Sequence, residues 1–502
     1  MVSMGSPCLV LKFHATSICK PIAICPHRTL LTFCHGHLAA RRSWWYAPWM
    51  PATFVATSPH LDLQYLLRVA ATASLGGLLF GFDIAIITGA GPFLTAHFNL
   101  GDWSLGIAFS SLLFGCVIGS AVAGRVTDLL GRRRLLLWVA LAFAVTSIAT
   151  GLAPNFSAFL IARFLGGVAV GGVSVLSPMY IAEIAPPTLR GRLGALYQFS
   201  IILGILASYA INYLLRDAGH FNWRLMFLTG TVPSSLFFLL LLSAPETPRF
   251  LALSRRTPEA LQLLTRLVGP QHAKAELAEI QASLSSRQGR WRDLLDPQLR
   301  PALVVGFCLA ILIHVSGINT IIDYAPAIFT AAGWKIDAAL FSTLIVGATN
   351  FVFTVVSFWM IDRFGRRPLY IVGSLGMALA LIGLAGMSYV GRFNGSAVLV
   401  LILAYLACFA SCIGPVFWTL VPEIFPNHIR GTAMTVPVLT QWIANAVVVL
   451  VFPFAFNQIG KAVTFSVLAL AAMMQAVFTI FFVPETKNRS LEEIAAHWNT
   501  RL

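Results

Sequence analysis

The sequence has few charged residues for its length. Only 11% of its 502 residues are Asp, Glu, Lys or Arg, whereas soluble globular proteins contain about 25%. Hydrophobic residues make up 58% of the chain. This composition excludes an ordinary soluble domain and indicates a chain that folds in a lipid bilayer.

The apolar residues do not alternate with polar ones, as the strands of a transmembrane β-barrel require. Instead, twelve apolar runs follow from Leu66 onward, six on each side of a polar middle segment. Each is about as long as the 20 residues that a helix needs to cross a bilayer, and a helix satisfies its own backbone amides in lipid. We therefore predict an all-α integral membrane protein with twelve transmembrane helices in two six-helix bundles of pseudo-symmetric arrangement. The predicted parts are an N-terminal extension (1–60), the first bundle (61–245), a cytoplasmic linker with short amphipathic helices (246–299), the second bundle (300–484) and a C-terminal tail (485–502).

The first 60 residues contain no Cys-x-x-Cys pair and no continuous apolar core of the kind a secretory signal needs. We expect a disordered cytoplasmic extension, or a start codon assigned too far upstream. The four cysteines that follow residue 60 lie in apolar runs, where a thiol behaves as a small hydrophobe. Neither a disulfide framework, nor a metal site, nor a cofactor is predicted. An enzyme is also not predicted, because no nucleophile and base or metal cluster occurs at a catalytic spacing.

The basic residues are unevenly distributed between the turns. Ten arginines lie in four turns, whereas the alternate turns carry Arg216, Arg224, Lys335, Arg392 and Lys461. By the positive-inside rule, the arginine-rich turns, both termini and the middle segment are cytoplasmic, and the protein lies in the plasma or inner membrane. The net charge of +15 does not indicate nucleic-acid binding, because bilayer spans separate the basic groups.

Three motifs occur twice, at nearly the same spacing, so the chain is a duplication of a half-domain. The most specific is Asp-x-x-Gly-Arg-Arg, with Asp128 in the first copy and Asp362 in the second. An acid beside arginines at a cytoplasmic turn suggests an ion-pair latch between neighbouring helices, which would favour one of two conformations. The alternative is an anchor that only orients the chain. The predicted cytoplasmic charge network consists of Asp128, Arg132, Arg133, Glu183, Arg190, Glu246 and Arg249, with Asp362, Arg366, Arg367, Glu423, Arg430 and Glu485 in the second half.

Asp83 lies within the first span, where an ionisable group costs about 2.5–3.5 kcal/mol or more. Arg163 at the start of the fourth span is a candidate partner. Burial disfavours the charged carboxylate and a nearby arginine favours it, so separating the two would change the proton affinity of Asp83. The pair is therefore a candidate proton-coupling switch. The alternative is a structural ion pair that holds two helices together.

Together, these motifs resemble the sugar porters of the major facilitator superfamily over about residues 66–498. The matching elements include Gly81-Phe82-Asp83, Gly131-Arg132-Arg133, Pro245-Glu246-Thr247, Gly317-Ile318-Asn319, Gly414-Pro415, Trp418, Gln441-Trp442 and Pro484-Glu485-Thr486. The resemblance implies a substrate cavity between two bundles that rock between outward-open and inward-open states.

In that family, amides and an indole hold the sugar, because amides both donate to and accept from hydroxyls and an indole covers the apolar face of the ring. By position, the resemblance implies Gln198, Asn319, Asn350, Trp418, Gln441, Trp442 and Asn445. For Asn350 or Asn445 alone, a hydrogen bond between helices is an equally good explanation.

Two departures from the family pattern affect the expected ligand. Ile313 and His314 stand where sugar porters usually carry two glutamines, and Asp323 with Tyr324 replaces an aromatic pair. His314 could donate to a sugar hydroxyl, and the unperturbed pKa of imidazole, about 6.5, would make binding pH-dependent. Asp323 could select an unusual polyol or pair with His314.

We therefore expect proton-coupled symport of a monosaccharide or related polyol by a monomer in the lipid bilayer. Passive sugar porters tend to have a neutral residue at the position of Asp83, which is why the resemblance favours symport. The alternatives are facilitated diffusion of a sugar, symport of a non-sugar solute, and a non-transporting sugar sensor.

Overall fold

The computed structural model describes residues 62–186, 189–285, 293–294, 296–426 and 429–487, all within one compact unit of residues 58–502. The predicted N-terminal extension and most of the predicted tail lie outside the described residues. Over the described ranges there are twelve helical spans long and apolar enough to cross a membrane, and no strand. The predicted all-α fold is confirmed.

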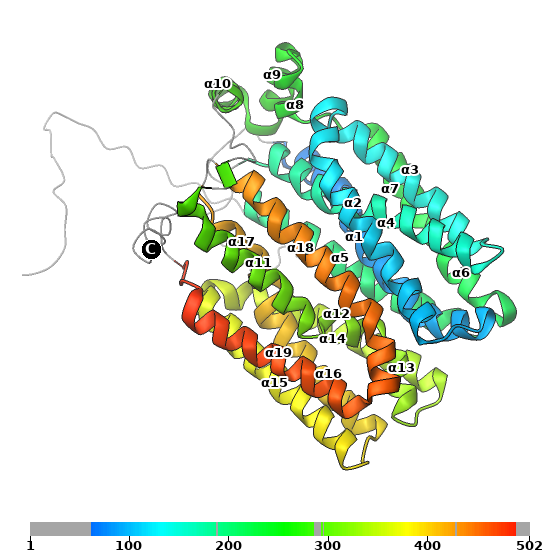
Figure 1. Ribbon diagram of the computed structural model, residues 1–502. Coiled ribbons are helices and arrows are strands. Elements are labelled where there is room, and N and C mark those ends of the chain that lie inside the picture. Colours follow the sequence, from blue (N-terminus) through cyan, green and yellow to red (C-terminus); the bar gives the residue numbers. More distant parts are fainter. Residues whose placement is uncertain (1–61, 187–188, 286–292, 295, 427–428, 488–502) are drawn as a thin grey trace, which may run out of the picture. The chain divides into compact units, whose positions relative to one another are not determined.

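The first six spans gather in one bundle (Figure 1). They are α1 (Leu63–Phe98), α2 (Asp102–Leu130), α3 (Arg132–Gly151), α4 (Phe156–Ile184), α5 (Arg190–Leu214) and a sixth span made of η2 (Gly219–Phe221), α6 (Asn222–Leu228) and α7 (Thr231–Ser243). Within it, α2 packs along α4 and α1 along α5. Small residues let these backbones approach closely, as where Gly167 lies against the Leu112 carbonyl.

The middle segment forms short helices, as predicted: α8 (Pro248–Leu253), α9 (Thr257–Val268) and α10 (Pro270–Ser285). The Thr247 hydroxyl accepts from the Phe250 amide and caps α8. By contrast, the N-cap of α9 is Arg256, and no side chain caps that helix. Gly269, with φ of +84°, ends α9, and α10 starts at the next residue, Pro270.

The second bundle repeats the six-span arrangement with more interruptions (Figure 1). Its elements are η4 (Pro297–Leu299), α11 (Arg300–Val315), α12 (Ile318–Asp323), α13 (Ala325–Ala331), α14 (Ile336–Phe364), α15 (Arg366–Tyr389), α16 (Gly395–Cys408), η5 (Phe409–Ile413), α17 (Gly414–Glu423), α18 (Arg430–Phe454), η6 (Ala455–Ile459) and α19 (Lys461–Phe482).

Two of its spans are broken near their middle. Between α11 and α12, Gly317 adopts φ of +93°, and a Cβ there would lie 2.7 Å from Leu468, so the break needs glycine. Between α16 and α17, η5 is a π-helical turn and Pro415 follows it. The break before α12 lies near the first bundle, because α12 packs against α1 as well as α18, whereas η5 packs against α14 and α15 of its own half.

Candidate functional site

The structure brings Asp83 and Arg163 together inside the first bundle. Arg163 Nη1 donates to Asp83 Oδ1 at 2.7 Å, and Nη2 donates to the Asp83 carbonyl oxygen at 3.1 Å. The Arg163 side chain is 2% exposed and that of Asp83 is 15% exposed, and the guanidinium also lies over the Phe227 ring. The two charges are therefore held by each other rather than by water.

This arrangement can respond to a proton. Removing one partner of a buried ion pair costs about 3–5 kcal/mol, because an uncompensated charge is left behind. If α1 and α4 separate at Asp83, the carboxylate loses its guanidinium, and binding a proton becomes the inexpensive way to keep it in the bilayer. The pair thus has the chemistry of a switch between a salt-bridged and a protonated state.

The five predicted substrate-binding amides lie on four helices. They are Gln198 on α5, Asn319 on α12, Asn350 on α14, and Gln441 and Asn445 on α18. No described residue forms a hydrogen bond with the side chains of Gln198, Asn319, Asn350 or Asn445, whereas the amide of Gln441 lies beside the His314 imidazole. Hydrogen bonding between helices therefore does not account for Asn350 or Asn445, although both are buried, with Asn350 8% and Asn445 2% exposed.

The predicted aromatic and imidazole groups fall into two environments. Trp418 on α17 is 44% exposed and meets the Phe417 ring edge-on, so its indole is available. Trp442 is 4% exposed, its Nε1 is sealed, and its ring meets Phe80 of the first bundle edge-on. Both ring nitrogens of His314 are also sealed and unpartnered, beside the Gln441 amide. In this structure His314 does not reach the open space that the amides reach.

The expected alternative that Asp323 pairs with His314 is wrong. No ion pair joins them in the described part of the chain, and the break at Gly317 separates the helices on which they lie. Asp323 is 6% exposed, and no described residue forms an ion pair or hydrogen bond with its carboxylate.

The first charged network joins α3, α4 and the turn before α8. Arg132 Nε lies 3.1 Å from Glu183 Oε2, and Arg132 Nη2 lies 3.1 Å from Asp128 Oδ1. The Thr247 hydroxyl donates to Glu183 Oε2 at 2.6 Å, and Arg249 lies 4.0 Å from Glu183. The Glu183 carboxylate is therefore the centre of this network.

Glu246 has a different task, because it caps a helix. Its carboxylate accepts from the backbone N–H groups of Arg132 at 3.0 Å and Arg133 at 3.1 Å, at the N-terminus of α3, where the helix dipole favours a negative charge. Gly131, with φ of +90°, makes room for it, since a Cβ there would lie 2.5 Å from Glu246 Oε2. The repeated motif therefore needs glycine at this position, because a larger residue would displace the glutamate carboxylate.

The second half repeats this geometry. Glu485 accepts from the backbone N–H groups of Arg366 and Arg367 at 3.2 Å, and Gly365, with φ of +88°, makes room for its carboxylate. The side chain of Arg366 donates to Glu423 at 2.9 Å, as Arg132 does to Glu183.

Not every predicted member joins a network. Arg190 is exposed and has no partner among the described residues. The side chains of Asp362 and Arg430 lie outside the described part of the structure, so their predicted roles stay predictions. Conversely, sequence reasoning missed Thr247 and its copy Thr486, which donates to Glu423 at 2.6 Å. The recurrence of Pro-Glu-Thr in both halves was the signal that could have found them.

Direct contacts between the two halves run from the middle of the spans, where Phe80 meets Trp442 and Phe199 meets Phe351, to the end opposite the arginine-rich turns, which we call the distal end. There the ring of Phe109 stacks on that of Tyr324 at 4.4 Å, and Trp103 stacks on Phe454 at 5.0 Å. Leu450 presents its carbonyl directly to Gly106.

Polar groups surround these rings. Arg216 Nε lies 3.3 Å from Asp337 Oδ1, and Asp102 accepts from the side-chain amides of Asn457 at 2.6 Å and Gln458 at 2.8 Å. At the arginine-rich end, no ion pair or hydrogen bond joins two described residues of opposite halves. The structure is therefore a state closed at the distal end.

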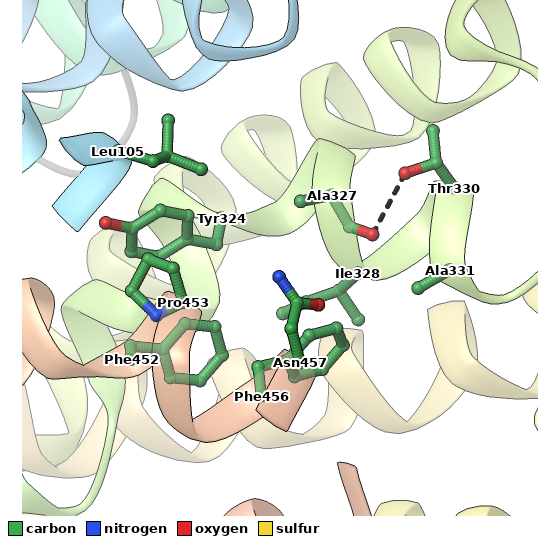
Figure 2. Close-up of a pocket in the computed structure, with 10 residues that line it drawn as sticks. All are labelled: Leu105, Tyr324, Ala327, Ile328, Thr330, Ala331, Phe452, Pro453, Phe456 and Asn457. Atoms are coloured by element: carbon green, nitrogen blue, oxygen red, sulfur yellow. Dashed lines mark hydrogen bonds between the residues drawn. The ribbon is translucent and has the colours of Figure 1, made fainter. Parts of the chain in front are cut away.

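A cavity of about 360 Å³ lies at the distal end, beside Tyr324 (Figure 2). Its lining is mostly apolar, with Leu105 from the first half and Asn457 among the residues from the second. None of the predicted substrate-binding residues lines it, so it is not the predicted sugar site.

Comparison with known proteins agrees with this geometry. The family described as "Sugar (and other) transporter" matches residues 69–498. The chain is 40% identical to the arabinose-proton symporter of Bacillus subtilis (strain 168) and 36% identical to the D-xylose-proton symporter of Escherichia coli (strain K12). Each alignment covers 87% of this chain and 96% of the relative.

Among solved structures, the inward-open conformation of the xylose transporter XylE from E. coli superposes with a TM-score of 0.77 at 35% identity. The match covers 86% of this chain and all of that one. Membership of one family accounts for the two-bundle fold, the paired charges and the duplicated motifs. This chain belongs to the sugar transporter family of the major facilitator superfamily.

Proposed function

We propose that the protein is a secondary transporter that carries a monosaccharide or related polyol together with H⁺. The observation that carries the proposal is the Asp83–Arg163 ion pair, which places a titratable group inside the bilayer beside a partner that can leave it. The relatives named as proton symporters of arabinose and xylose support the same reading.

The solute is proposed to bind between the bundles. Gln198, Asn319, Asn350, Gln441 and Asn445 would exchange hydrogen bonds with its hydroxyls, since amides both donate and accept, and four of the five have no hydrogen-bond partner among the described residues. The indole of Trp418 would cover the apolar face of the ring, while Trp442 and His314 would support Gln441 from behind.

Proton and solute would be coupled through alternating access. The protonated carboxyl of Asp83 would release Arg163 in the state that binds solute from outside, and loss of the proton to the other side would restore the ion pair. The arginine-rich turns, both termini and the linker are proposed to face the cytoplasm, so the distal end is extracellular and the structure is inward-facing. We further propose a monomer in the plasma or inner membrane that catalyses no chemical reaction.

Reconstitution tests this function. Vesicles containing the purified protein would receive an imposed pH gradient and radiolabelled pentoses, hexoses or inositols. Accumulation above the outside concentration, abolished by a protonophore, is the expected result for at least one of them. Equilibration without accumulation would instead indicate facilitated diffusion, and no uptake of any of them would indicate a non-sugar solute or a sensor.

A further inference from the structure

The cavity at the distal end has an apolar floor and a polar mouth (Figure 2). Its floor includes three buried aromatic side chains, with Tyr324 3%, Phe452 4% and Phe456 5% exposed. The exposed polar residues of the lining, Thr330 and Asn457, form the mouth. Small-molecule sites have volumes of about 300–1,000 Å³, and this cavity, at about 360 Å³, is at the lower end of that range. It can therefore hold a molecule of one or two rings.

The three aromatic rings form one continuous wall. Phe452 stacks on Tyr324 at 5.2 Å, with 22° between the ring planes, and on Phe456 at 5.4 Å, with 26° between them. Aromatic rings prefer to bind another ring in offset-stacked or edge-to-face contact. A rigid ring also loses less conformational entropy on binding than a flexible chain does. The wall therefore favours an aromatic ligand over a hydrocarbon chain.

The polar atoms at the mouth can accept hydrogen bonds. The Thr330 hydroxyl donates to the Ala327 carbonyl at 3.0 Å, which leaves the lone pairs of its oxygen for a ligand. Asn457 Nδ2 donates to Asp102 at 2.6 Å, and no described residue donates to Asn457 Oδ1. A ligand that fits this mouth must therefore carry a hydrogen-bond donor.

Two charged groups beside the mouth are already engaged. Asp102 accepts from the side-chain amides of Asn457 and Gln458, and Lys461 Nζ donates to the Ala331 carbonyl at 3.0 Å. A charged ligand would have to break one of these bonds or enter the apolar floor without a partner, which is costly. The ligand is therefore uncharged.

We propose that the cavity binds an uncharged aromatic molecule that carries a hydroxyl group. Its ring lies against the wall of Tyr324, Phe452 and Phe456, and its hydroxyl donates to the Thr330 oxygen at the mouth. None of the residues proposed to bind the transported solute lines the cavity, so this is a separate site.

The site depends on the conformation of the protein. Leu105 of α2 comes from the first half, whereas the other lining residues come from the second. One turn further along α2, Phe109 stacks on Tyr324, so α2 completes the cavity only while the distal end is closed. A ligand that binds only the closed state stabilises that state and slows alternating access. This consequence rests on the proposed function, whereas the binding site does not.

Site protection tests the binding, with the two-ring phenol 2-naphthol as the probe. In lipid nanodiscs, a protein whose native cysteines are replaced receives one cysteine, either at Ala331 in the cavity or at the exposed His220 outside it. Saturating 2-naphthol should slow the reaction of Ala331→Cys with a water-soluble maleimide at least fivefold and leave that of His220→Cys unchanged. No slowing, or equal slowing at both positions through partitioning into lipid, would overturn the proposal.

Naphthalene, which lacks the hydroxyl, and the Thr330→Val variant test the ligand class. In the Ala331→Cys protein, half-maximal protection should need about fivefold more naphthalene than 2-naphthol, and adding Thr330→Val should remove this difference. Equal protection by both compounds without Thr330→Val would indicate a site for any hydrocarbon, a lipid chain included, and would contradict the proposed ligand. A difference that persists in Thr330→Val would exclude Thr330 as the acceptor.

The effect on transport is read in vesicles. 2-Naphthol should inhibit solute exchange, and Ala331→Phe, which fills the cavity, should be insensitive. Equal inhibition of both proteins would contradict the link between this site and closure. Failure of the proposed symport would appear separately, as absent uptake without 2-naphthol, and would leave the protection result unchanged.

Discussion

At the scale of single residues, the second half contains two kinds of buried glutamine. Gln441 is 8% exposed and lies beside the His314 imidazole. Gln475 on α19 is 0% exposed, and both its amide atoms are sealed without a partner, beside Tyr370. Only the first can meet a solute, although both look alike as polar residues in apolar helices.

Replacing Gln441 with Ala should weaken solute binding about fivefold, because one hydrogen bond contributes about 1 kcal/mol. The matched control is Gln475→Ala, which should change stability but not affinity. Titration of each purified variant with the solute measures its affinity. Unchanged affinity in Gln441→Ala would remove this residue from the site.

Sequence alone could place Asp83, Arg163 and the five amides on their helices, because a polar group within an apolar run is costly to bury and therefore stands out. Sequence could not predict how exposed each of these side chains is. His314 and Trp442 carry polar atoms in equally apolar runs, yet those atoms are sealed by neighbours from other helices. Which polar atoms face open space depends on packing between segments far apart in the chain.

At the scale of elements, each duplicated turn is a helix N-terminus capped from another part of the chain. The Asp-x-x-Gly-Arg-Arg motif predicted an ion-pair network, and the structure adds that the backbone amides of Arg132 and Arg133 bind Glu246. Sequence could not show this cap, because the glutamate is more than a hundred residues away from the amides that it binds.

Replacing Gly131 with Ala should therefore destabilise the protein. A non-glycine residue with positive φ costs about 1–3 kcal/mol, and the new Cβ would displace the Glu246 carboxylate. Thermal unfolding in detergent should show a lower midpoint.

Gly124→Ala is the matched control for that variant. Gly124 lies within α2 with open space around its Cα, so Ala should be neutral or stabilise by up to about 1 kcal/mol. Equal unfolding midpoints for the two variants would show that the Glu246 carboxylate can cap α3 without glycine at position 131.

At the scale of the whole molecule, the contacts of the distal end determine how firmly this state is held. The Arg216–Asp337 pair is half-exposed, and such pairs contribute about 0–1 kcal/mol. The buried Phe109–Tyr324 stack contributes both apolar area and an aromatic interaction of about 0.5–1.5 kcal/mol. The aromatic residues rather than the ion pair should therefore hold the distal end closed.

Phe109→Ala should accordingly open the distal end more than Arg216→Ala does. In a protein without other reactive cysteines, the rate at which Leu105→Cys reacts with a membrane-impermeant maleimide reports the opening. The expected rise is several-fold for Phe109→Ala and less than about fivefold for Arg216→Ala. A larger effect of Arg216→Ala would show that the ion pair dominates.

The two-bundle architecture was predictable, because hydropathy and a repeated motif are properties of the sequence itself. Closure of the distal end was not predictable, since a transporter of this kind adopts more than one conformation with the same sequence. The break at Gly317 and the turn at η5 also escaped prediction, because both occur within runs apolar enough to be continuous helices.

Asp83 is proposed to carry the proton that moves with the solute. The most direct measurement follows proton and solute fluxes together in vesicles containing either the natural protein or Asp83→Asn. The natural protein should take up protons with solute, and a gradient of one pH unit should support at most about tenfold accumulation for one proton per solute. Asp83→Asn should exchange solute across the membrane without moving protons, whereas proton uptake undiminished in this variant would contradict the account.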